Sequence, residues 1–400
     1  MNLFNSSYYK VQKTFLTLCG AWPYHTNYIY LFLRIIFITG AVFFMVVPEM
    51  IVMVRNLTNY DVIMSCLPML TGSLVGFCKG IVLFYNSHKV KILWEELSQD
   101  WKTLKPKDLS IIEGYAEKGR LVSIAYACCI YSLVICYYLL SFVSPALDII
   151  LPLNESRHRT LIFPGEFYVR TDDHFFLFLT MEFCGILCAA HLLLTLDTLY
   201  MTLMLHSCGM FVVLSRRLEK VKIKKFGDKI DPTIKNNLTT IQDQQIYFSL
   251  SECIKLHLKC IKFGERLNST FGAAFVTDLA FGVLGTSTSA VKFVLSINEP
   301  NQRLRYGLLY VVQSIRIFCN SFPGQLLSDY SRDVKLAMLK SEWYKFPEQS
   351  KKLLLVLMIR VDRPIEFTVG KVFTMNVRFF TMVTRTCLSY CTVMLSAQKN

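Results

Sequence analysis

Seven long apolar stretches alternate with polar segments along this chain of 400 residues. Each provides about the 20 residues that an α-helix needs to cross a bilayer. They predict transmembrane helices at about 29–54, 62–85, 119–144, 174–218, 240–296, 304–322 and 366–397. The predicted fold class is an all-α integral membrane protein with seven transmembrane helices.

The fourth and fifth stretches are too long for a membrane alone. Residues 174–218 contain no proline, and at about 1.5 Å per residue a helix over them is roughly 67 Å long. That is about twice the hydrocarbon thickness of a bilayer. The fifth begins in polar sequence near Thr240. We expect both helices to leave the membrane together and to form a packed intracellular domain.

Shorter periodic segments flank the spans. A helix from about Tyr8 to Gly20 is predicted to lie on the inner membrane surface. Residues 86–118 have apolar residues near helical spacing with charged residues on the opposite face, which predicts an amphipathic helix. Pro323-Gly324 is predicted to end the sixth span, because proline cannot donate the helical hydrogen bond. Two cytoplasmic helices are then expected, at 325–344 and 350–361.

The spans and their connections predict four parts. They are an N-terminal cytoplasmic segment at 1–28, spans one to four at 29–218 with an extracellular loop at 145–173, spans five and six with cytoplasmic anchor helices at 219–366, and the seventh span at 367–400.

Lysine and arginine are distributed unevenly between the two sets of connections. Segments 1–28, 86–120, 215–266 and 323–366 contain 29 of them, whereas 55–61, 145–173, 297–305 and 397–400 contain 7. By the positive-inside rule the first set is cytoplasmic. The N-terminus is therefore predicted inside and the C-terminus outside, which is the reverse of a G-protein-coupled receptor.

Composition supports the membrane class and excludes several functions. The mean hydropathy is +0.39, and 53% of residues are hydrophobic. The net charge of +14 lies mainly in the cytoplasmic segments, where it faces acidic lipid headgroups, and no nucleic-acid-binding signature accompanies it. The 14 cysteines include no CxxC pair, so we expect neither a metal nor a cofactor.

Catalytic and G-protein-coupled signatures are also missing from the sequence. There is no GxSxG, HExxH or P-loop motif, so an enzyme is not expected. The third span does not end in Asp-Arg-Tyr, and the seventh lacks an NPxxY motif. We therefore expect no G-protein partner.

The C-terminal third carries an ordered set of residues that resembles the insect odorant receptor family. Residues 319–344 and 367–396 contain most of the resemblance, and the segment Leu18–Pro23 before the first span is also typical. The matching positions are Cys319, Gly324, Ser328, Trp343, Tyr344, Arg385, Thr386, Ser389 and Tyr390.

Two other classes remain open from the sequence. Gustatory receptors end in a Gln-Phe pair that is absent here, since Ser396-Ala397 stands in its place. A secondary transporter would predict internal repeats and interrupted spans, which the sequence lacks. The co-receptor of the odorant family is longer between its fourth and fifth spans, so this chain resembles a variable, ligand-tuned subunit.

The resemblance implies a cation channel in the cell membrane of sensory neuron dendrites. Such a receptor is a heterotetramer with the co-receptor subunit, gated by a small hydrophobic odorant, and its seventh helices line the pore. The implied pore and gate residues are Ser389, Val393, Ser396 and Ala397, which share one helical stripe. Arg385 extends that stripe inward, and the sequence offers no account of it.

The resemblance also places a ligand pocket in the outer half of the membrane, between spans two, three, four and six. Aromatic and methionine side chains suit an adaptable apolar cavity, although each alone is equally consistent with core packing. The candidates are Met69, Ser73, Tyr137, Tyr138, Ser141, Phe178, Met181, Tyr306 and Tyr310.

Glycosylation sequons and intramembrane charges add further expectations. Asn154 should be glycosylated on the outside, whereas Asn237 should be cytoplasmic and unmodified. Ionisable residues within spans are costly and are functional candidates, either for gating or for a structural pair. Those singled out are Glu49, Lys79, Glu182 and Lys292.

Overall fold

The computed structural model describes residues 3–25, 28–151, 161–163, 165, 173–222, 232–370 and 372–399. Helices make up most of these residues. The α-helices are α1 (Lys10–Cys19), α2 (Tyr28–Arg55), α3 (Tyr60–Tyr85), α4 (Ser87–Thr103), α5 (Pro106–Leu140), α6 (Val143–Ile150), α7 (Phe175–Glu219), α8 (Pro232–Leu295), α9 (Pro300–Lys340), α10 (Glu348–Val361) and α11 (Val377–Lys399). Two 3-10 turns (Leu3–Asn5 and Trp343–Lys345) and two short strands, β1 (Thr368–Val369) and β2 (Phe373–Thr374), complete the regular structure of the described ranges.

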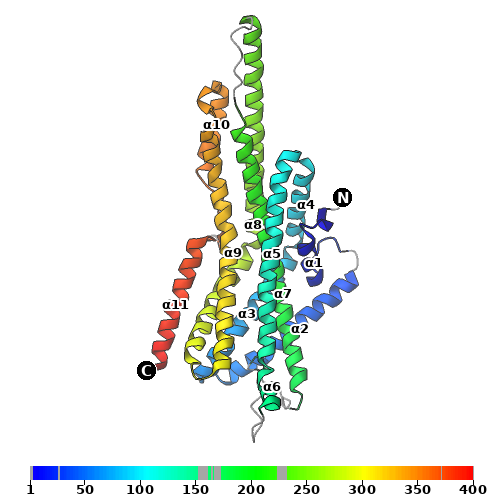
Figure 1. Cartoon of the computed structure of the whole chain (residues 1–400), viewed down its shortest axis with the longest axis vertical. Helices are drawn as coiled ribbons and strands as arrows, with labels where there is room; N and C mark the ends of the chain where they lie inside the picture. Colours follow the sequence, from blue (N-terminus) through cyan, green and yellow to red (C-terminus); the bar gives the residue numbers. More distant parts are fainter. Residues whose placement is uncertain are drawn as a thin grey trace.

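The helices form an elongated bundle with distinct ends (Figure 1). α7 is its central element and packs against α1, α2, α3, α5, α8 and α9. α10 and the first part of α8 lie at one end, and α6 and the C-terminus lie at the other. α11 stands at the edge of the bundle and contacts α8 and α9. The two ends correspond to the predicted cytoplasmic and extracellular sides.

Five helices in the described part of the chain are long and apolar enough to cross a membrane: α2, α3, α5, α7 and α8. α9 and α11 correspond to the predicted sixth and seventh spans, and each carries arginines among its apolar residues. The architecture is the all-α, seven-span membrane fold that the sequence predicts.

The long fourth and fifth helices are confirmed with small changes. α7 runs unbroken from Phe175 to Glu219, as predicted. α8 begins at Pro232, earlier than the Thr240 expected, because proline is well tolerated in the first turn, where its missing N–H has no helical partner.

The prediction that Pro323-Gly324 ends the sixth helix was wrong. α9 continues through both residues to Lys340 and so joins the sixth span to the predicted helix at 325–344. A proline costs the helix one backbone hydrogen bond, and close packing on this face offsets that loss. Both residues are buried, and the space left by Gly324 admits the Met375 carbonyl, which a Cβ atom would overlap.

Further boundaries differ from the prediction. The segment at 86–118 is divided between α4 and the first part of α5, and α5 ends at Leu140 instead of 144. The seventh helix begins at Val377 instead of 366, because a β-hairpin with Thr368 opposite Thr374 occupies the intervening residues. The Asn268 side chain on α8 binds this hairpin, accepting from the Thr368 N–H and donating to Thr368 Oγ1, each at 3.0 Å. The predicted loop at 145–173 begins inside a helix, α6.

The N-terminal helix α1 packs against the bundle through buried contacts, close to the predicted bounds. Gln12 of α1 is 1% exposed and donates hydrogen bonds to Ser123 Oγ on α5 (2.9 Å) and Thr202 Oγ1 on α7 (2.6 Å). Tyr9 packs edge-on against the buried Trp94 of α4. These contacts fix α1 and α4 to the inner ends of the transmembrane helices.

A buried charge joins α4 to the long helices outside the membrane. Asp100 accepts from His206 Nε2 at 3.2 Å and also pairs with Lys259. Burial alone raises the pKa of a carboxyl, but the hydrogen bonds and charges of His206 and Lys259 outweigh it, so the pKa of Asp100 is lowered. The ionised carboxylate therefore helps to hold the intracellular helices together.

His257, on the intracellular part of α8, gives the fold a pH dependence. Burial, and secondarily the positive charge of Arg360, lower its pKa to about 4, whereas in the unfolded chain the imidazole titrates near pH 6.5. The unfolded chain therefore binds more protons between these values, and stability falls as pH decreases from about 6.5 towards 4. At pH 5 the loss is on the order of 2 kcal/mol.

His257→Gln is expected to reduce this loss, because glutamine does not titrate. Thermal unfolding of detergent-purified protein at pH 7.5 and pH 5.0 measures it, with His88→Gln at an exposed position as the matched control. An equal acid shift of the unfolding temperature in wild type and His257→Gln would contradict the assignment.

Candidate functional site

A largely apolar cavity of about 120 Å³ lies within the outer part of the bundle, between α3, α5, α7 and α9. These are the second, third, fourth and sixth spans, the helices between which the family resemblance implied a ligand pocket. The lining residues are Pro68, Met69, Gly72, Ser73, Ile130, Leu133, Val134, Tyr137, Phe163, Ile186, Ala189, Ala190, Leu193, Leu309, Val312, Gln313 and Arg316.

Small residues account for the open space. A Cβ built at Gly72 would meet no atom within 4 Å, so α3 presents a gap to the cavity at this position. One turn further on, Gly76 has the opposite role, because a Cβ there would lie 2.5 Å from the Ala189 carbonyl oxygen. α3 and α7 therefore touch at Gly76 and leave the cavity open at Gly72.

Residues 161–163 of the extracellular loop cover the outer side of the cavity, with Phe163 in its wall. The Ile162 N–H donates to Glu182 Oε2 on α7 at 2.8 Å, and Arg305 on α9 donates to the Leu161 carbonyl at 2.9 Å. Arg305 also donates to Ser141 Oγ at 3.0 Å. The cover is thus held by polar side chains of two lining helices, α7 and α9, while Ser141 at the C-terminal end of α5 binds Arg305.

Three of the predicted ligand-binding residues line this cavity: Met69, Ser73 and Tyr137. The other six lie elsewhere. Tyr138 packs against Phe183 with the ring centroids 4.3 Å apart, and Ser141 binds Arg305. Phe178 is buried and Met181 is 38% exposed, the Tyr306 ring lies 5.8 Å from Lys292 Nζ, and Tyr310 is half-buried on α9. A ligand contact with these six stays a prediction.

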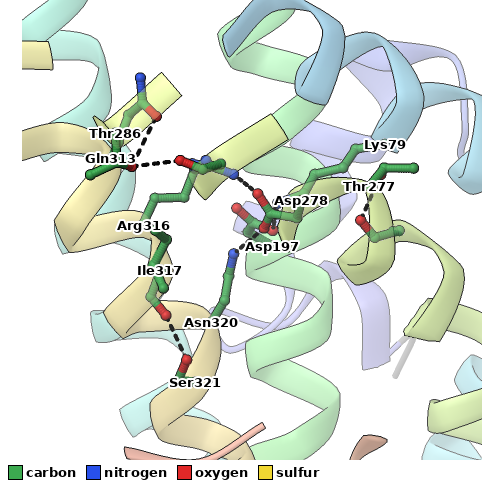
Figure 2. Close-up of polar contacts among 12 residues, drawn as sticks. Lys79, Asp197, Thr277, Asp278, Thr286, Gln313, Arg316, Ile317, Asn320 and Ser321 are labelled. Atoms are coloured by element: carbon green, nitrogen blue, oxygen red, sulfur yellow. Dashed lines mark hydrogen bonds and ion pairs between the residues drawn. The ribbon is translucent and has the colours of Figure 1, made fainter. Parts of the chain in front are cut away.

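Four charged side chains converge at the inner side of the cavity (Figure 2). Lys79 of α3 pairs with Asp197 of α7 at 2.6 Å and with Asp278 of α8 at 2.9 Å. Arg316 of α9, which also lines the cavity, pairs with Asp278. We call Lys79, Asp197, Asp278 and Arg316 the charge cluster. Its two cations balance its two anions, and every member is at least nine-tenths buried.

Polar neighbours complete the charge cluster. Tyr126 Oη donates to Asp197 Oδ2 at 3.0 Å, and Asn320 Nδ2 donates to Asp278 Oδ2 at 2.9 Å. Buried charges are tolerated only when paired and hydrogen-bonded in this way. The cluster therefore fixes the relative positions of four transmembrane helices.

Sequence reasoning singled out only one member of this cluster, Lys79. Asp197, Asp278 and Arg316 were missed, although an aspartate in the run LLLTLDTLYM is the kind of intramembrane charge that signals a functional or structural pair. Of the other charges singled out, Lys292 pairs with Asp61 at 2.7 Å, Glu182 holds the loop, and Glu49 is fully buried on α2.

The charge cluster also reaches the seventh span. Asp278 and Asn320 border a small cleft whose far wall consists of Met375, Phe379 and Val383, at the start of α11. Further along, Cys387 Sγ contacts the Val283 carbonyl on α8 at 3.7 Å. A continuous packed path therefore leads from the cavity, through Arg316 and Asp278, to α11.

α11 buries one stripe and exposes the other. Val383, Cys387 and Cys391 are buried on the side of α8 and α9. The predicted pore residues Ser389, Val393 and Ser396 lie on the exposed side of the single chain, as does Arg385. Ala397 is in the last turns of α11, with its side chain outside the described part, and the predicted glycosylation site Asn154 also lies outside the described residues.

Comparison with known proteins agrees with this architecture. Residues 59–388 match the family model described as 7tm Odorant receptor. Odorant receptor 10 of Aedes albopictus is 24% identical over 176 residues, 44% of this chain and 46% of that protein. Odorant receptor Or2 of Anopheles gambiae is 26% identical over 150 residues, 37% and 39% of the two chains. The matched segments span less than half of these curated relatives.

The fold is shared over nearly the whole chain. The olfactory receptor OR5 of the insect Machilis hrabei, solved in complex with eugenol, superposes with a TM-score of 0.77, covering 97% of both chains at 15% identity. These features define a multi-pass all-α membrane receptor and not an enzyme. The chain belongs to the insect odorant receptor family.

Proposed function

We propose that this chain is a ligand-tuned odorant receptor subunit that binds small hydrophobic volatile molecules and opens a non-selective cation channel. The cavity between α3, α5, α7 and α9 carries the proposal, because it lies among the helices, is largely apolar and is bordered by a few polar groups. Cavities of this kind are the usual binding sites for small ligands. A solved relative with the same fold is in complex with eugenol, which supports a small-molecule ligand here.

Gating requires that the ligand bind the open state more tightly than the closed one. A shift from 1:99 to 99:1 open needs roughly 5.5 kcal/mol of differential binding, whereas a micromolar ligand provides only about 8 kcal/mol in total. The packed path from Arg316 through Asp278 to the start of α11 supports a direct coupling between ligand binding in the cavity and the position of α11. Modest efficacy, or several sites acting together, is expected.

The exposed side of α11 supports a pore-lining role for Ser389, Val393, Ser396 and Ala397. Small and hydroxyl side chains around one valine suit a narrow constriction that dewets when closed. Three of these residues lie on the side that the rest of the chain leaves uncovered. In the proposed assembly, other subunits of a heterotetramer that includes the co-receptor cover this side.

The proposed location is the cell membrane of sensory neurons, with the C-terminus and Asn154 outside. Glycosylation of Asn154 but not of Asn237 is expected, since of these two asparagines only Asn154 is on the outer side in this topology. Enzymatic deglycosylation of wild type and of single Asn→Gln variants tests it. Modification of Asn237 alone would overturn the orientation.

Current recording tests the proposed function itself. Cells that express this chain with the co-receptor are expected to pass a cation current under a panel of volatile ligands, whereas cells with the co-receptor alone are not. Ligand uptake without current would favour a transporter and contradict the proposal.

A further inference from the structure

The hydrogen-bonding groups of the cavity are unevenly distributed. Most of the wall is aliphatic or aromatic, and two of its strongly polar side chains, Gln313 and Arg316, are three residues apart on α9. Both are buried, with 6% and 3% of their surface exposed. They form a polar patch at one side of an otherwise apolar space.

The two hydroxyl groups of the wall already use their protons within the protein. Ser73 Oγ donates to the Met69 carbonyl at 2.9 Å, and Tyr137 Oη donates to the Arg305 carbonyl at 2.7 Å. A ligand must therefore obtain a hydrogen-bond donor from elsewhere in the cavity.

Gln313 offers such a donor. Its Oε1 lies 3.2 Å from Thr286 Oγ1, whose proton goes to the Gly282 carbonyl at 2.7 Å, and its Nε2 donates to the Pro68 carbonyl at 3.4 Å. That second contact is longer than the usual N–H···O distance of about 2.9–3.0 Å, and an amide nitrogen carries two protons. The Pro68 carbonyl takes one of these two protons, so the other can be donated to an oxygen atom in the cavity that Gln313 lines.

The space for this amide depends on a glycine of the facing helix. A Cβ at Gly285 of α8 would lie 2.8 Å from Gln313 Oε1 and would also overlap Thr71 Oγ1. The orientation of Gln313 is therefore fixed both by packing and by hydrogen bonds.

The charge cluster beside Gln313 determines which ligand charge is tolerated. Arg316 is paired with Asp278, and Lys79 with Asp197, so the cluster is neutral as a whole. An ionised acid or amine in the cavity would add a buried charge with no counter-charge, which is strongly unfavourable. Neutral ligands are favoured over charged ligands of the same size.

We propose that Gln313 makes this cavity selective for neutral ligands with an acceptor oxygen, such as ketones, esters and ethers, over hydrocarbons of equal size and over carboxylates and amines. The inference rests on the proposed function and names the ligand class of the same site. One neutral hydrogen bond is worth about 0.5–1.5 kcal/mol, which corresponds to roughly a two- to twelvefold change in affinity.

Matched ligands test the proposal in wild-type receptor co-expressed with the co-receptor. A ketone, the alkane of equal heavy-atom count and the corresponding carboxylate are applied, and the concentration for half-maximal current is measured. We expect the ketone to act at about fivefold lower concentration than the alkane, and the carboxylate to be inactive at neutral pH. Gln313→Met, which keeps the length but has no donor, should bring the ketone-to-alkane ratio close to one.

Leu309→Met, at another lining position, is the control and should leave that ratio unchanged while shifting both ligands alike. Equal potency of ketone and alkane in wild type, a potent carboxylate, or an unchanged ratio in Gln313→Met would each overturn the inference while the channel function stands. Absence of current for every ligand would instead contradict the proposed function. If Gln313→Met does not reach the cell surface, the wild-type ratios decide the question.

Discussion

Lys79→Met is expected to remove most of this receptor from the cell surface. The substitution leaves Asp197 and Asp278 with Arg316 as the only remaining cation of the charge cluster. Breaking a buried ion pair from one side typically costs about 3–5 kcal/mol, a large part of the roughly 5–15 kcal/mol that holds a domain folded. Surface biotinylation and the thermal unfolding temperature in detergent measure the effect.

Two variants separate charge imbalance from loss of the lysine itself. Lys79→Met combined with Asp197→Asn restores neutrality, and the asparagine oxygen can still accept from Tyr126, so much of the surface level should return. Lys340→Met breaks a pair in which the lysine side chain is 69% exposed and should change little. If Lys79→Met proves as stable as Lys340→Met, the charge cluster does not hold the helices together.

In the proposed function, the charge cluster also relates ligand binding to the channel. It lies between the cavity and the start of α11, and its members come from α3, α7, α8 and α9. Under this proposal, a change in helix spacing at the cavity is transmitted to Asp278 and Asn320, which border a cleft with Met375, Phe379 and Val383. We therefore expect the same group of side chains to contribute to both stability and gating.

Much of the fold follows from the sequence because the bilayer limits the alternatives. Apolar length predicts the spans, and the excess length of residues 174–218 predicts the extension of α7. Proline predicted helix ends less reliably than apolar length predicted the spans. Pro323 lies inside α9, since tight packing of Gly324 on Met375 holds the helix in place where hydrogen bonding is lost.

The site was predictable as a set of helices but less so as a set of residues. Tyr137 and Tyr138 are neighbours on α5, yet Tyr137 lines the cavity and Tyr138 packs on Phe183. A helix that is apolar all round gives no amphipathic signal of which side faces inward. Gln313 and Arg316 lie inside the predicted sixth span at 304–322 and were not singled out. Only the packing of α9 shows that they line the cavity.

A larger side chain at Gly72 is expected to close the cavity without disturbing the helices. A Cβ at this position meets no atom within 4 Å, so Gly72→Ala is free of clashes and should stabilise α3 by up to about 1 kcal/mol through its helix propensity. Gly72→Phe places a phenyl ring into a cavity of about 120 Å³. Benzene fills an engineered protein cavity of roughly 150 Å³, so the ring should occupy most of the space.

The most direct measurement is therefore a comparison of ligand dose–response curves for Gly72→Phe and Gly72→Ala, each co-expressed with the co-receptor at matched surface levels. The account predicts wild-type sensitivity for Gly72→Ala and at least a tenfold loss of sensitivity, or no response, for Gly72→Phe. Superimposable curves for the two variants would contradict the assignment of this cavity as the ligand site.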